Sequence, residues 1–145
     1  MFRGRSKHSL DEKGRLAIPA RFKEFLNNKR DHCLVLTNHF NCLWAFARED
    51  WTVIEEKAAN LSLFDKAVST YRRYFISGAQ ECLIKHGKIT IPPDLREIAA
   101  LKKEVVLVGE LKFFEIWDRD QWEEEFERAK GSFPEVSQSL SELGI

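Results

Sequence analysis

The stretch Asp11-Glu12-Lys13-Gly14-Arg15 concentrates side chains that could do chemistry: two carboxylates, two cations and one glycine. A pair of carboxylates can act as general acid and base when both face one substrate. Adjacent residues of an extended chain point to opposite sides, however, so Asp11 and Glu12 are poorly placed to share a substrate. We therefore predict a turn here and no catalytic residues.

A second group lies between residues 32 and 42 and contains the side-chain types that bind zinc. Its members are His32, Cys33, His39 and Cys42. Four such ligands suit a tetrahedral zinc ion, but their spacing matches no usual zinc motif. The sequence also contains no phosphate-binding loop, no G-x-G-x-x-G and no G-x-S-x-G motif. We predict no metal, no cofactor and no enzymatic activity.

Arg15 allows two interpretations. It could form an ion pair with Asp11, four residues earlier across the turn. It could also contact DNA, because a two-stranded β element fits the major groove and an arginine there can make two hydrogen bonds to guanine. Neighbouring cations of the suitable type for phosphate contacts are Arg3, Arg5, Lys7 and Lys13.

The charge of the chain is zero overall but unevenly distributed. Residues 1–30 contain nine Lys/Arg and three acids, a net charge of +6. Residues 110–145 contain four Lys/Arg and ten acids, a net charge of −6. A local basic face can bind a polyanion even in a neutral protein, although charge runs are also found on merely solvated surfaces. The 145 residues suffice for one domain with a core, and no apolar run approaches 18 residues.

The N-terminus is basic and lacks the apolar run of a signal peptide, and the three cysteines form no Cys-x-x-Cys pair. We expect a cytoplasmic protein whose thiols are buried and reduced.

The sequence contains an internal repeat. Residues 13–26 align with 86–99, which places Gly14 on Gly87 and Arg15 on Lys88. Residues 42–51 align with 113–122, and Trp51 falls on Trp122. In this alignment Ile84 stands in the place of Asp11, and Cys33 and Cys42 correspond to Val105 and Phe113, which are core-type residues. The second copy therefore lacks both the carboxylates and the thiols.

Each copy predicts the same series of elements. A strand leads to a turn at Gly14 or Gly87, where glycine permits a positive φ, and a short strand follows at 15–18 or 88–91. A proline then opens a short helix, at 20–28 or 93–99. Further strands are expected at 33–37, 42–47, 104–108 and 113–117, and closing helices at 48–60 and 118–130.

Two segments lie outside the repeats. Apolar residues at helical spacing predict a connecting helix at 61–77, which could pack across the junction of the repeats or form a subunit interface. The segment 131–145 follows Gly131, which predicts a helix stop and a frayed terminus. The alternative is a partner-docking face that consists of Phe133, Val136, Leu140 and Leu143. The predicted organisation is a first repeat at 5–51, the connecting helix, a second repeat at 78–122, and a helix end and tail at 123–145.

The motifs make the family recognisable. "MFRGRSKHSLDEKGRLAIPARFKEFL" resembles the start of the MraZ family of transcriptional regulators, and "ITIPPDLREIAALKKEVVLVGELKFFEIWDRDQWEEEF" resembles its second half. The resemblance implies two tandem AbrB-like (SpoVT-AbrB) modules, each marked by Asp-x-x-x-Arg. The motif is complete as Asp11 to Arg15, whereas the second copy has Ile84 and Lys88. Lys88 keeps the charge but lacks the planar fork of arginine.

The resemblance further implies an α+β, β-rich fold, a double-split β-barrel of two pseudo-repeats with short flanking helices. It implies a ring-like homo-oligomer that binds direct repeats in promoter DNA and represses a division and cell-wall gene cluster, with no membrane and a location at the nucleoid. DNA contacts are then expected from Arg15, Lys13, Arg3, Arg5, Lys7 and Lys88, and turn-forming roles from Asp11, Gly14 and Gly87. The alternative function is an antitoxin-like or scaffolding module that uses the same barrel to bind protein.

Overall fold

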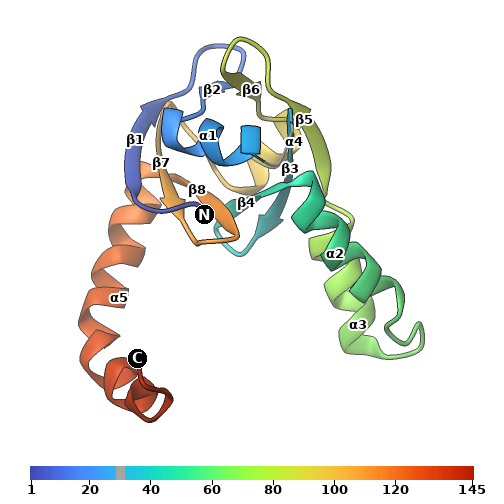
Figure 1. The fold of residues 1–145 in the computed structure, drawn as a ribbon, viewed down its shortest axis with the longest axis vertical. Coiled ribbons are helices and arrows are strands. Elements are labelled where there is room, and N and C mark those ends of the chain that lie inside the picture. The colour runs from blue at the N-terminus through green and yellow to red at the C-terminus, as the bar shows by residue number, and fades with distance from the viewer. Residues whose placement is uncertain (29–31) are drawn as a thin grey trace.

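A six-stranded antiparallel sheet and a separate two-stranded ribbon organise the molecule, and the computed structural model describes residues 1–28 and 32–145 (Figure 1). In spatial order, the sheet consists of β1 (Arg5–Ser9), β7 (Glu104–Gly109), β8 (Phe113–Asp118), β4 (Cys42–Ala47), β3 (Cys33–His39) and β5 (Gln80–Leu83). The ribbon pairs β2 (Arg15–Ala17) with β6 (Lys88–Thr90). The predicted strands and the α+β class are confirmed.

The two halves of the chain are interleaved around a pseudo-two-fold axis. The first strand of each copy pairs with the other copy, since β1 joins β7 and β5 joins β3. In the middle of the sheet Trp44 lies opposite Glu115, its own equivalent in the repeat. In the ribbon Leu16 lies opposite Ile89, which is also an equivalent pair. The axis therefore passes through the sheet centre and the ribbon centre.

The main core fills the space between the inner face of the sheet, the ribbon and two short helices. These helices are α1 (Ala20–Asn28) and α4 (Pro93–Ile98), and Pro93 stands at the first turn of the second one, where a missing N–H costs nothing. Fully buried core side chains include Phe2, Leu16, Phe22, Leu34, Ile89, Leu95 and Phe114. The core therefore contacts the inner face of the ribbon through Leu16 and Ile89, and the opposite face of the ribbon stays exposed to solvent.

Two longer helices cover the outer face of the sheet at equivalent places. Trp51 of α2 (Arg48–Ala59) packs on Phe46, with ring centroids 5.3 Å apart. Trp122 of α5 (Arg119–Leu140) packs on Trp117, at 5.8 Å. Both helices then extend away from the sheet on the side opposite the ribbon turns, α5 on one flank and α2 on the other (Figure 1).

The connecting segment is less helical than its apolar spacing predicts. Helix α3 (Lys66–Tyr71) begins only after Asp65, whose carboxylate accepts hydrogen bonds from the backbone of Ala67 and Val68. A π-helical turn, η1 (Arg72–Ile76), follows directly. The expected start near residue 61 is wrong because Asp65 is the better cap. The segment packs on the sheet through Phe75, which is buried beside Val35 and Trp51.

The predicted helix stop at Gly131 is also wrong. Helix α5 continues through Gly131 and Pro134 to Leu140, and a short 3-10 turn, η2 (Ser141–Leu143), follows. The left-handed cap stands at Gly144 instead, where φ is 77°. A glycine ends a helix only where the backbone turns left-handed, and Gly131 keeps a negative φ. None of the helices among the described residues is long and apolar enough to cross a membrane.

Candidate nucleic-acid interface

The ribbon presents both predicted cations on one exposed face. Burial alternates along each strand, so Leu16 and Ile89 face the core while Arg15 and Lys88 face outward. Arg15 lies opposite Thr90, two residues from Lys88 on the same strand. Such diagonal neighbours have Cα atoms roughly 7–8 Å apart, so the two cations share one patch of surface.

The first turn is built around the carboxylate of Asp11. One oxygen accepts the backbone N–H groups of Lys13 and Arg15, each at 2.9 Å, and the Gly14 N–H reaches the Asp11 carbonyl at 3.0 Å. Gly14 adopts a φ of 77°, as a three-residue hairpin loop requires. The hydrogen bonds from the Arg15 backbone, and then from its side chain, lower the pKa of Asp11 to about 2.

The same carboxylate also orients Arg15. Its second oxygen accepts Nε of Arg15 at 2.5 Å, yet the Arg15 side chain stays 48% exposed. Within the described part of the chain, no hydrogen bond or ion pair engages the two terminal nitrogens. The two sequence interpretations of Arg15 are therefore compatible, because Asp11 fixes the base of the fork and the free end points outward. Those two nitrogens match the fork that a guanine edge or a phosphate accepts.

The second turn has a different construction. Lys85 and Lys88 exchange backbone hydrogen bonds at 2.8 and 2.9 Å around His86 and Gly87, which both adopt positive φ. This is a two-residue hairpin of type I′, one residue shorter than the first turn. No described carboxylate makes an ion pair with Lys88. The two copies thus carry one fixed guanidinium and one flexible ammonium.

The strand pairing corrects the repeat alignment at two places. The backbone N–H of Leu10 bonds to Lys103, and that of Ile84 bonds in the same way to His32. Ile84 therefore occupies the place of Leu10, a core position, and not that of Asp11. By the strand register, Cys33 corresponds to Glu104 and not to Val105. Both slips come from aligning loops whose lengths differ.

Two cations near the turns were missed by the sequence analysis. A methyl group added at Gly14 would lie 2.5 Å from Cζ of Arg96, and one added at Gly87 would lie 3.1 Å from Nζ of Lys23. Each turn thus packs against a cation from the helix of the other copy. The repeat could have indicated these two residues, because the alignment of residues 13–26 with 86–99 pairs the cation Lys23 with the cation Arg96.

The N-terminal cations do not gather at the ribbon. Lys13 is exposed in the first turn, but Arg5 and Lys7 lie on the outer face of β1, opposite Val108 and Val106. The Arg5 guanidinium stands 4.8 Å from the ring centre of Phe126 in α5. Arg3 precedes β1 at its far end, where its carbonyl accepts Nε of Arg21. Since a strand rises about 3.3 Å per residue, Arg5 lies roughly 13 Å from the ribbon end of β1.

The candidate zinc ligands are dispersed in the packing. Cys33 and Cys42 are buried, and the His39 ring stacks on the Trp44 ring with their centroids 3.6 Å apart. Burial raises the pKa of the Cys42 thiol well above its usual range and that of Cys82 to about 11. The described residues contain no group of three or more potential metal ligands. The burial that the sequence predicted for the three cysteines is confirmed.

Comparison with known proteins decides the family. Residues 1–74 and 75–142 each match the family described as "MraZ protein, putative antitoxin-like". The chain belongs to the MraZ family. The division at residue 74 agrees with two tandem repeats, and the resemblance deduced from the sequence motifs is confirmed.

Several relatives match over almost their whole length. The chain is 41% identical to the transcriptional regulator MraZ of Syntrophobacter fumaroxidans, over 99% of this chain and 97% of the relative. It is 40% identical to the protein of that name from Alkaliphilus metalliredigens, over 100% of both. A third such regulator, from Pelotomaculum thermopropionicum, is 41% identical over 100% of this chain and 99% of the relative. This is a family of transcriptional regulators and not of enzymes.

Proposed function

We propose that the protein is a sequence-specific DNA-binding regulator of transcription whose β2–β6 ribbon enters the major groove. The observation that carries this proposal is the outward guanidinium of Arg15, held at Nε by Asp11 on an exposed two-stranded ribbon. The major groove is about 12 Å wide and admits a ribbon of two strands. A pre-oriented arginine loses less side-chain freedom when it binds, which favours reading one base over general attraction.

The cations around the ribbon have different roles in the proposed binding of DNA. Arg15 donates to guanine O6 and N7, the acceptor pair that no other base pair presents in this arrangement. Lys88, which lacks the fork, contacts phosphate together with Lys13, Lys23 and Arg96. Their positions beside both turns place charge on either side of the groove-entering face. Arg3, Arg5 and Lys7 remain candidates for outlying phosphate contacts only.

The finer features follow the family resemblance. We propose that the sheet and the ribbon form a double-split barrel, and that several copies assemble into a ring that engages direct repeats upstream of the protein's own gene. Linking weak modules raises the overall affinity by a factor of 10²–10⁴ through effective concentration. Repression of a division and cell-wall gene cluster, in the cytoplasm at the nucleoid, is the proposed consequence.

The test is a gel shift with DNA upstream of the protein's own gene. Arg15→Ala should abolish specific binding while circular dichroism and mass remain unchanged. Lys112→Ala, at an exposed lysine in the turn between β7 and β8, is the matched control and should bind normally. Unchanged affinity of the Arg15 variant would refute the proposal.

A second function, an antitoxin-like protein-interaction module, is suggested by the description of the family. It predicts a tight protein partner and little dependence of DNA affinity on salt. A steep fall of DNA affinity with rising salt would count against it.

A further inference from the structure

The distal half of α5 carries an apolar stripe without a partner among the described residues. Ala129, Phe133, Val136 and Leu140 follow one another at alternating spacings of four and three, which keeps them on one side of a helix. Phe133 is 65% exposed and no residue of α5 is buried. The proximal part is anchored, since Trp122 packs on Trp117 and Phe126 receives Arg5. Beyond it the helix projects from the body (Figure 1).

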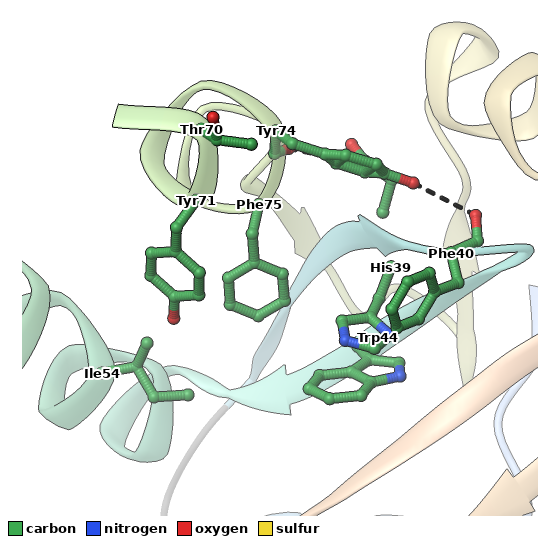
Figure 2. Close-up of a pocket in the computed structure, with 9 residues that line it drawn as sticks. His39, Phe40, Trp44, Ile54, Thr70, Tyr71, Tyr74 and Phe75 are labelled. Atoms are coloured by element: carbon green, nitrogen blue, oxygen red, sulfur yellow. Dashed lines mark hydrogen bonds between the residues drawn. The ribbon is translucent and has the colours of Figure 1, made fainter. Parts of the chain in front are cut away.

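A groove of matching chemistry lies on the other flank of the molecule. It begins with an apolar cavity of about 340 Å³ between α2, α3, η1 and the turn that joins β3 to β4. Figure 2 shows its wall of Trp44, Tyr71 and Phe75, with Ile54 at the side of α2. The Tyr74 hydroxyl donates to the Phe40 carbonyl at 3.1 Å and braces the far side.

The groove continues along the arm that α2 and α3 form. A second apolar cavity, of about 380 Å³, shares Ile54 and Tyr71 with the first and extends to Ala58, Leu61 and Val68. Two adjoining apolar cavities in line suit an amphipathic helix, whose anchors recur every three or four residues.

The charges of the docking segment and of one bank of the groove are complementary. Residues 131–145, which include Phe133, Val136 and Leu140, contain two acids and no Lys/Arg, a net charge of −2. The segment Lys66–Ile76, which forms one bank of the groove, contains three Lys/Arg and no acid. The other bank, α2, contains four acids and two Lys/Arg, and of these Lys57 lines the second cavity. Attraction therefore draws the end of α5 toward the bank that α3 and η1 form.

The arrangement excludes closure within one chain. Helix α5 and the α2–α3 arm extend from opposite flanks of the sheet (Figure 1). We propose that the distal stripe of α5 from one copy docks in the groove between α2 and α3 of a second copy, with Phe133 in the cavity beside Trp44. Each copy then offers one helix and one groove, a head-to-tail contact that closes into a ring when the rotation fits. This inference names the two surfaces through which the copies assemble in the proposed function. The closure into a ring rests on that proposed function, whereas the contact between two copies does not.

The test uses two full-length variants and the measured mass in solution. Phe133→Glu disables the helix, and Tyr71→Glu disables the groove. Each variant alone should be monomeric, at 16.9 kDa. An equimolar mixture should form a species of two chains, because the intact helix of one variant meets the intact groove of the other. Helix-to-helix pairing predicts the reverse, with Tyr71→Glu still assembled and no complex in the mixture.

Matched controls separate docking from folding. Gln138→Glu adds the same charge to another face of α5, and Val53→Glu adds it to α2 outside both cavities, so both should assemble as the wild type does. If Tyr71→Glu fails to fold by circular dichroism, Leu61→Glu at the exposed end of the groove takes its place. Wild-type assembly in both Phe133→Glu and the groove variant overturns the proposal.

The outcome is independent of DNA recognition. On DNA with a single site, Phe133→Glu should bind as tightly as a wild-type module does. On DNA with repeated sites it should lose a factor of 10²–10⁴, the avidity of linked modules. Loss of single-site binding in Arg15→Ala concerns the proposed function alone, and loss of assembly in Phe133→Glu concerns the docking surface alone.

Discussion

Replacing Gly14 by alanine should destabilise the protein by about 1.5–3.5 kcal/mol. The backbone contribution is about 1–2 kcal/mol, because an L-residue at a φ of 77° brings its Cβ against its own carbonyl. The new methyl group would also lie 2.5 Å from Cζ of Arg96 and displace that side chain. The displaced side chain loses the hydrogen bond from its Nε to the Ile91 carbonyl, now 3.0 Å long, which is worth about 0.5–1.5 kcal/mol.

Alanine variants of two further glycines serve as comparisons for the Gly14→Ala measurement. Gly87→Ala carries the same backbone cost at a φ of 74°, but the nearest atom is the mobile end of Lys23 at 3.1 Å, so about 1–2 kcal/mol is expected. Gly131→Ala meets no atom within 4 Å inside α5 and should stabilise by about 0.5–1 kcal/mol. Urea unfolding at one protein concentration gives the three free energies of unfolding. Equal effects at Gly14 and Gly131 would contradict the positive φ at Gly14 and its contact with Arg96.

Two other predictions concern the charges of the ribbon. The pKa of Asp11 is lowered to about 2, so the ionised carboxylate stabilises the fold fully above its ordinary pKa near 4 and loses this effect as the pH falls toward 2. The melting temperatures of the wild type and of Asp11→Asn should therefore converge between about pH 4 and pH 2. A difference in melting temperature that stays constant over this window would contradict the prediction. Lys23→Gln and Arg96→Gln together should flatten the plot of log affinity for DNA against log salt by about 2 units, with Lys112→Gln as the unaffected control. An unchanged slope would remove both side chains from the phosphate contacts.

The sequence predicted those features of the fold that depend on local patterns. The glycines at 14 and 87 and the prolines after each short strand located the two strands of the ribbon, and the repeat placed Lys88 at the position of Arg15. The pairing of these strands, which brings both cations to one face, is seen only in the structure. The local signals work because the positive φ of glycine and the fixed φ of proline are properties of single residues.

Most features that the sequence did not reveal depend on chain segments far apart in sequence. Arg3 and Arg5 are close to Arg15 in sequence, but β1 runs away from the ribbon and separates them. Lys23 and Arg96 reach the opposite copy's turn only because the two repeats interleave, which no local pattern reveals. The continuation of α5 past Gly131 has a local cause instead, because glycine adopts either sign of φ and the sequence does not fix which one.

The substitution Arg15→Lys tests whether Arg15 reads a base, because lysine keeps the charge and removes the fork that Asp11 orients. The measurement is the ratio of affinities for a site selected from random DNA by the wild-type protein and for a scrambled duplex. We expect the ratio to fall at least tenfold, about 1.4 kcal/mol, while the salt dependence of binding to the scrambled duplex stays the same. An unchanged ratio would show that Arg15 does not read the base and would contradict base recognition by the ribbon.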